Sequence, residues 1–259
     1  MKIDFFVEFP ETGLQKADLI NFSSVVYIAA KSYAEFQQYK EKLWAINPRV
    51  KAAYWPILKK SYWLSPFSFT WELKKIRREL EERSPKKPLK VLIDLELPML
   101  YKKLFFINFF SFWRNKKKIG KLFDDASSLN LEIATAEYDF SAWGWLTNKI
   151  LRCLGLSYAG SHKRIIMYYS SMLPNWRKKI CKRGLKKIYR GQNRNLEVGL
   201  GVIDVGILGN ESKLSIKNLE KDLRFMKENG TNTAVIFQLS GLNKDYLEVI
   251  KKYINFSAE

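Results

Sequence analysis

The chain has 259 residues, 47% of them hydrophobic, which is enough to bury the core of one large domain. It contains 45 Lys and Arg against 26 Asp and Glu, and this formal charge of +19 predicts a polyanionic partner: an anionic membrane surface, an acidic polymer or nucleic acid. One histidine and two cysteines outside any CxxC motif all but exclude zinc sites built on His and Cys, Ser-His-Asp triads and two-histidine phosphodiesterases.

Eight short runs rich in β-branched and aromatic residues predict buried strands. These runs are 2–9, 23–30, 49–57, 90–97, 131–139, 164–171, 196–204 and 232–240. Helical patterns lie between most of them, and the clearest are 32–47, 69–84, 214–230 and 244–256.

Strands that alternate with helices pair in parallel through right-handed crossovers. Eight such units without a linker predict a single-domain (β/α)8 TIM barrel over residues 1–259. An open doubly wound sheet is the alternative. It lacks its usual support, because no GxGxxG follows the first strand and the chain has no P-loop.

Two acids interrupt the apolar run VLIDLELP at residues 91–98. Side chains two positions apart share one face of a strand, so Asp94 and Glu96 are expected to point together into the barrel mouth, where catalytic groups lie. Burial and mutual repulsion raise carboxyl pKa values, and a protonated Glu96 beside an ionised Asp94 would suit a general acid. The structural alternative is that such acids pair with Lys or Arg inside the barrel.

Glu137 and Asp139 repeat the two-residue spacing on the next predicted strand. We predict Glu137 as a further catalytic group. The remaining predicted substrate-binding residues lie at other strand ends and are Glu8, Trp55, Tyr168, Tyr169, Asp204 and Gln238, together with Asp139. Tyr62, Trp63 and Trp143 are further aromatic candidates for stacking on a sugar ring.

Asp94-Leu95-Glu96 resembles the end of the DxxDxDxE motif of family 18 glycosidases, the chitinase-like barrels, and Met167-Tyr168-Tyr169 is similar to their M-x-Y. The resemblance implies that Glu96 is the acid/base and that Asp94 orients an acetamido group whose oxygen acts as nucleophile. It also implies that Tyr169 contacts that acetamido group.

The sequence departs from the family pattern at several positions. Val91 stands where an earlier Asp of the motif is expected, Ser170 follows Tyr169 where Asp is usual, and Phe237-Gln238 replaces the Trp of strand eight. The resemblance therefore supports a glycosidase-like barrel more than the substrate-assisted mechanism. Glu96 and Glu137 could instead act as the two carboxyls of an ordinary glycosidase.

Basic and aromatic insertions follow the fourth, fifth and sixth predicted strands. Segments 98–123 and 140–160 combine Lys and Arg with large aromatics, which is the composition of a membrane-interfacial segment. The predicted interfacial residues are Phe105, Phe106, Phe109, Phe110, Trp113, Trp143 and Trp145. The alternatives are a homo-oligomer interface or a crossover packed on the barrel, and stacking on single-stranded nucleic acid.

Residues MKIDFFVEFPE do not predict a signal peptide, and no apolar run reaches the roughly 18 to 20 residues of a spanning helix. We therefore expect a cytoplasmic, peripherally membrane-associated enzyme that cleaves or transfers a glycosidic bond in a lipid-linked or anionic glycan. The alternatives are a non-catalytic barrel that binds glycan, lipid or nucleic acid, and a metal-dependent phosphodiesterase acting on phospholipid. No cofactor is expected, although an all-oxygen Mg²⁺ or Ca²⁺ site stays open.

Overall fold

The computed structural model describes residues 1–83, 88–98, 101–138, 145–158, 160, 162–190 and 196–254. Eight parallel strands form a closed barrel in chain order, and β1 pairs with β8 to close it. The strands are β1 (Lys2–Val7), β2 (Ser24–Ala30), β3 (Val50–Pro56), β4 (Leu89–Asp94), β5 (Leu131–Tyr138), β6 (Lys163–Tyr168), β7 (Leu196–Gly201) and β8 (Thr233–Phe237). The predicted (β/α)8 TIM barrel is confirmed.

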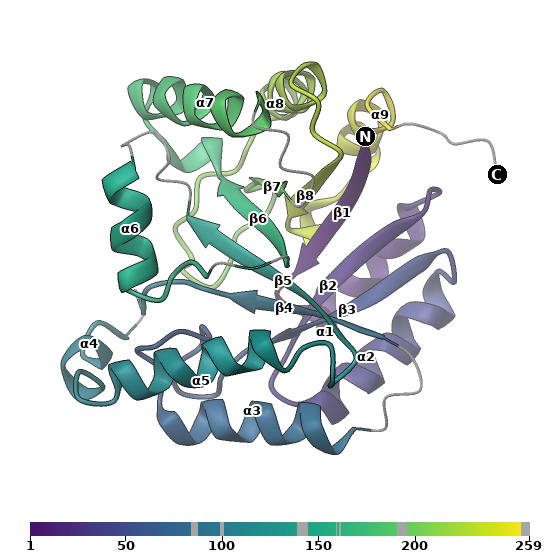
Figure 1. The fold of residues 1–259 in the computed structure, drawn as a ribbon. Coiled ribbons are helices and arrows are strands. Elements are labelled where there is room, and N and C mark those ends of the chain that lie inside the picture. The colour runs from purple at the N-terminus through teal and green to yellow at the C-terminus, as the bar shows by residue number, and fades with distance from the viewer. Residues whose placement is uncertain are drawn as a thin grey trace.

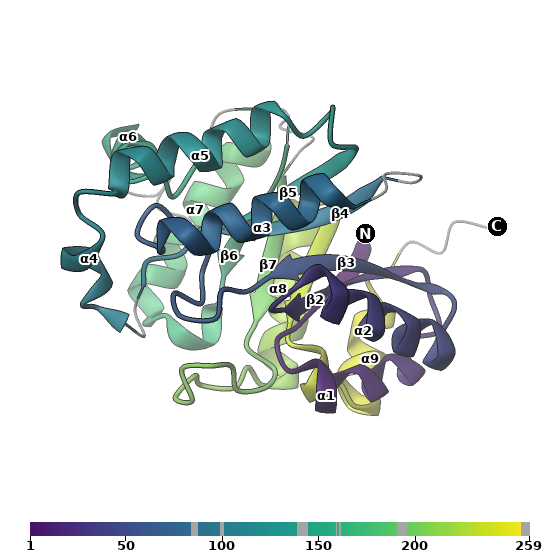
Figure 2. The ribbon, with the colours of Figure 1, turned by 90° about the horizontal axis from the view of Figure 1, so that it is seen from below.

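Helices surround the barrel (Figure 1). They are α1 (Pro10–Gly13), α2 (Tyr33–Ile46), α3 (Thr70–Glu82), α4 (Leu104–Ile107), α5 (Phe112–Asp124), α6 (Trp145–Cys153), α7 (Asn175–Arg190), α8 (Ile216–Glu228) and α9 (Lys244–Lys251). Helices α3 and α5 lie side by side, and the short α4 lies at the edge of the molecule beyond the start of α5 (Figure 2).

The helices form where apolar residues recur at helical spacing behind a capping side chain. Helix α2 starts after Ser32, whose hydroxyl accepts a hydrogen bond from the backbone N–H of Glu35, and it buries Phe36, Tyr39 and Leu43 against the sheet. Helix α8 starts in the same way after Ser215.

Two apolar layers stabilise the fold, because successive side chains of each strand point to opposite faces. On β5, Ala134 and Ala136 belong to the cluster that fills the barrel interior, whereas Ile133 packs in the outer layer between sheet and helices. This alternation decides which polar side chains can reach the barrel mouth. No helix in the described ranges is long and apolar enough to span a bilayer.

Candidate active site

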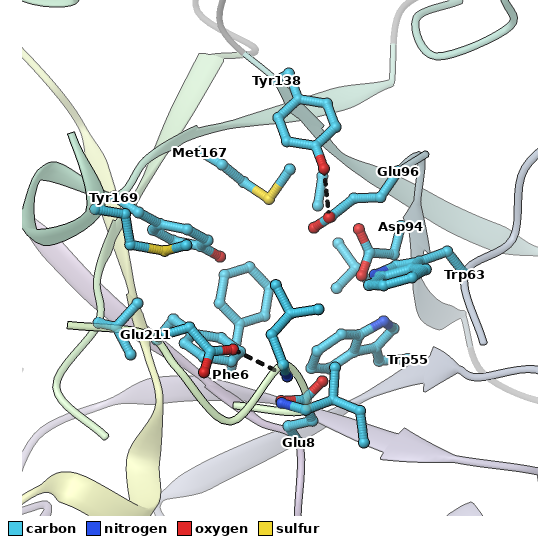
Figure 3. A pocket seen from close by; sticks show the side chains of 17 residues that line it. Phe6, Glu8, Trp55, Trp63, Asp94, Glu96, Tyr138, Met167, Tyr169 and Glu211 are labelled. Atoms are coloured by element: carbon cyan, nitrogen blue, oxygen red, sulfur yellow. Dashed lines mark hydrogen bonds between the residues drawn. The ribbon is translucent and has the colours of Figure 1, made fainter. Parts of the chain in front are cut away.

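A pocket lies at the carboxyl ends of the strands (Figure 3). Asp94 is the last residue of β4, and Glu96 follows two positions later. Both line the pocket, while Leu95 between them is fully buried in the outer apolar layer. Aromatic side chains form much of the wall, and these are Phe6, Trp55, Trp63, Tyr138, Tyr169 and Phe237. The structure thus places both acids on the pocket face, as their spacing predicts, and their catalytic role stays a prediction.

Burial raises the pKa of both acids at the end of β4. Burial raises the pKa of Glu96 to about 7, although hydrogen bonds from the hydroxyl of Tyr138, 2.7 Å away, and from Asp94 lower it in part. Burial, followed by the charge of Glu96, raises the pKa of Asp94 well above its usual value. Which of the two carboxyls holds a proton at rest stays a prediction, and the sequence-based expectation is Glu96.

Glu8 contributes a third carboxyl, from the residue after β1. Its carboxylate accepts hydrogen bonds from the Tyr62 hydroxyl and, at 2.8 Å, from the backbone N–H of Ile207. Burial raises its pKa to about 7 against these two hydrogen bonds, and the charges of Glu96 and Glu211 add to the increase. The Tyr62 backbone has φ of 63°, a conformation that is uncommon outside glycine, so the loop after β3 holds this side chain at an energetic cost.

Glu211 and Tyr138 were not predicted from the sequence. Glu211 comes from the loop between β7 and α8, which has no periodic pattern, so nothing in the sequence separates it from a surface acid. Tyr138, two positions after the inward-facing Ala136, could have been found by strand alternation.

Glu137 does not line the pocket, and its predicted catalytic position is wrong. The pocket takes Ala136 and Tyr138 from β5, so Glu137 points to the outer face. There its carboxylate bonds the guanidinium of Arg164 at 2.7 Å and the hydroxyl of Thr135 at 2.6 Å. Burial would raise its pKa, but contacts with His162, Arg164 and Thr135 lower it to about 2.

Three predicted substrate-binding residues also lie outside the pocket. Tyr168 faces α7, with the Lys182 ammonium 5.9 Å from its ring centre. Asp204 pairs with the Lys213 ammonium at 2.7 Å and accepts from the Ser240 hydroxyl at 2.8 Å. Gln238 is buried, accepts from the backbone N–H of Glu8 and donates to the carbonyl of Val205. Gln238 therefore joins the end of β1 to the loop after β7 and does not contact the pocket.

Three other residues predicted from the sequence line the pocket, and these are Trp55, Trp63 and Tyr169. Asp139 and Trp143 lie outside the described residues. In the part of the chain that is described, no three His, Cys, Asp or Glu side chains are grouped to hold a metal ion.

The aromatics after β4 are mostly on the surface. Phe106, Phe109, Phe110 and Trp113 are 84%, 67%, 94% and 65% exposed. Phe105 differs, because its ring packs on Phe67 with centroids 4.8 Å apart and is only partly exposed. Trp145 is the first residue of α6, and the structure does not describe its side chain.

Known structures share the fold of this chain across its whole length. The glycoside hydrolase domain of PgaB (BpsB) from Bordetella bronchiseptica is 12% identical, with a TM-score of 0.57 and coverage of 100% of this chain and 99% of that one. The GH18 chitinase ChiB from Flavobacterium johnsoniae is 12% identical, with a TM-score of 0.55 and coverage of 97% and 93%. A xylose isomerase domain protein from Planctomyces limnophilus is 11% identical, with a TM-score of 0.53 and coverage of 97% and 94%. No protein-family model and no curated protein matches the sequence.

Substitution of Glu96 and of Glu137 should change the stability of the fold in opposite directions. Glu96→Gln removes a carboxyl whose raised pKa makes ionisation in the fold unfavourable, a cost that grows as the pH rises from about 4.5 through about 7. We expect this variant to be about 1–2 kcal/mol more stable than the parent at pH 8 and no more stable at pH 4.

Glu137→Gln leaves Arg164 without its buried carboxylate and should lower stability by about 3 kcal/mol at pH 7. Because the pKa of Glu137 is lowered to about 2, its contribution is present above about pH 4.5 and disappears only as the pH falls toward 2. Urea unfolding of both variants at pH 4 and pH 8 measures these effects. Equal destabilisation by the two substitutions would contradict the assignment of Glu137 to structure and Glu96 to the pocket.

Proposed function

We propose that the protein hydrolyses a glycosidic bond with Glu96 as the acid/base. The observation that carries this proposal is the Asp94–Glu96 pair, which lines an aromatic pocket and whose carboxyl pKa values are raised. No Lys or Arg in the described part of the chain forms a salt bridge with either acid. The structural alternative for these acids predicts such an internal cation, so the pocket favours a functional site over ion pairs that only stabilise the barrel.

The reaction needs one proton transfer in each direction. Glu96, whose pKa is raised to about 7, donates its proton to the glycosidic oxygen, and the electrons of the breaking C–O bond leave with that oxygen. The positive charge that develops on the sugar is stabilised by the neighbouring carboxyls. Water then attacks the anomeric carbon and its proton returns to Glu96. Tyr138 orients the Glu96 carboxyl through the 2.7 Å hydrogen bond throughout.

Activity should depend on Glu96 and on its protonation. Glu96→Gln is expected to lower kcat by 100-fold or more, because an amide cannot donate the proton. In the parent enzyme, kcat/KM should fall as the pH rises above about 7, since Glu96 then loses its proton. Release of 4-methylumbelliferone from a panel of aryl hexosides, N-acetylhexosaminides and hexosaminides measures both effects.

Glu248→Gln, which removes an exposed acid of α9, is the control and should keep full activity. Cleavage that persists unchanged in the Glu96→Gln variant would remove the proposal. So would the failure of the parent protein to cleave any aryl glycoside or natural oligosaccharide offered.

We propose in addition that α4 and the start of α5 bind an anionic membrane surface. This rests on the surface formed by Phe106, Phe109, Phe110 and Trp113, which we call the aromatic surface, and on Lys102, Lys103, Arg114, Lys117 and Lys118 around it. Each inserted aromatic contributes about 1.5–3 kcal/mol and each Lys or Arg about 1 kcal/mol at an anionic leaflet. Because α4 follows the carboxyl end of β4, the pocket and this surface lie toward the same end of the barrel.

Vesicle binding tests this surface. The double variant Phe110→Ser/Trp113→Ser should bind vesicles of phosphatidylcholine and phosphatidylglycerol about 100-fold more weakly than the parent. Trp44→Ser is the matched control, because Trp44 on α2 is also 65% exposed but lies away from the insertions. Co-sedimentation at low and high salt gives the readout. Equal losses in both variants, or no pelleting of the parent at low salt, would contradict membrane binding.

A further inference from the structure

The pocket is lined by acids, whereas the protein as a whole is basic. Four carboxyls line it, from Glu8, Asp94, Glu96 and Glu211. No Lys, Arg or His is among its lining residues in the described part of the chain. The undescribed segments that directly follow β4 and β5, at 99–100 and 139–144, contain no basic residue in their sequence either. An otherwise strongly basic protein therefore concentrates acid where its substrate is expected.

Glu211 has a carboxylate oxygen that is buried and unused. The residue is only 9% exposed, and its Oε1 accepts a hydrogen bond from the backbone N–H of Leu208 at 3.2 Å. Its Oε2 is buried without a hydrogen-bond partner within the described residues. A carboxylate oxygen removed from water without a donor is costly, so a donor that reaches this oxygen is bound favourably.

Glu8 and Glu211 lie close together at one side of the pocket. A Cβ built on Gly206 would lie 2.7 Å from Oε2 of Glu8 and 2.9 Å from Oε1 of Glu211, so both carboxylates flank a single point. Only glycine fits there, which lets the loop after β7 bring the two groups together. Figure 3 shows Glu8 and Glu211 across the pocket from Asp94 and Glu96.

We propose that Glu8 and Glu211 bind the primary ammonium group of an unacetylated amino sugar. An ammonium carries three N–H donors and a positive charge, so it supplies the donor that Glu211 lacks and offsets the repulsion between the two carboxylates. The aromatic wall, with Trp55 and Tyr169, suits the apolar face of a sugar ring and an adjacent cation. That the ligand is a sugar rests on the proposed function, whereas the preference for a cation rests on the placement of Glu8 beside Glu211 and on the buried, unpartnered Oε2 of Glu211.

Other sugar classes fit this side of the pocket less well. An N-acetyl group places a neutral amide and a methyl group where two carboxylates need a cation. An anionic sugar, which was one of the sequence-based expectations, meets four acids and no base. A net charge of +19 also repels a cationic oligosaccharide at long range, so a preference for one has to arise inside the pocket.

Binding measurements on the Glu96→Gln protein test the proposal without turnover. By calorimetry at pH 7, glucosamine tetramer should bind at least 10-fold more tightly than N-acetylglucosamine tetramer. Adding Glu211→Gln should weaken glucosamine tetramer binding about 10-fold or more and leave the acetylated tetramer unchanged. Adding Glu41→Gln, which removes an exposed acid on α2, should change neither affinity.

Equal affinity for the two tetramers, tighter binding of the acetylated one, or an unchanged preference in the Glu211→Gln protein would overturn the ammonium site. If Glu211→Gln does not fold, the comparison of the two tetramers on the Glu96→Gln protein still decides. The result also separates the two proposals. Selective binding of glucosamine tetramer that the parent enzyme does not cleave would remove the hydrolase and keep the site, and cleavage without a preference for the free amine would do the reverse.

Discussion

The barrel mouth buries carboxyl groups that form no salt bridge with any Lys or Arg of the described chain, and the rest of the site follows from this constraint. Asp94, Glu96 and Glu8 all have raised pKa values because burial disfavours their charge. Hydrogen bonds from tyrosine hydroxyls partly offset the increase for Glu96 and Glu8, whose pKa values are about 7. Such groups reduce the stability of the fold at neutral pH, and their retention in an otherwise apolar pocket is typical of a site that has a function. The strained backbone of Tyr62, which holds Glu8, belongs to the same arrangement.

Glu96 and Glu137, at the ends of adjacent strands, have opposite roles. The alternation of side chains between the two faces of a strand decides which role each has. Glu96 follows β4 on the face that points into the barrel, where it finds an acid, a tyrosine and open space. Glu137 on β5 points outward by one residue of alternation and finds Arg164 and Thr135. The pKa of Glu96 is raised to about 7 and that of Glu137 is lowered to about 2, although the two residues have the same intrinsic chemistry.

Charge is segregated between the surface and the pocket. Residues 101–190 contain 19 Lys and Arg against 5 Asp and Glu, so most of the positive excess lies on the helices and loops after β4, β5 and β6. The pocket is acidic within the same molecule. The net positive charge repels a cationic ligand at long range, but salt screens this repulsion beyond about one Debye length, so the acidic lining of the pocket decides the selection at short range.

The sequence by itself determined the fold and the acid pair. Eight apolar runs separated by helical patterns admit few arrangements other than a closed parallel barrel, and two acids spaced two apart in a buried strand must share a face. Only the tertiary structure decided which face each strand end presents, and so it excluded Glu137, Tyr168, Asp204 and Gln238 from the pocket. It also brought in Glu211, over a hundred residues from Asp94, from a loop without any pattern. The reason is physical: periodicity records local geometry, whereas the partner of a buried charge is set by contacts between segments that are distant in the chain.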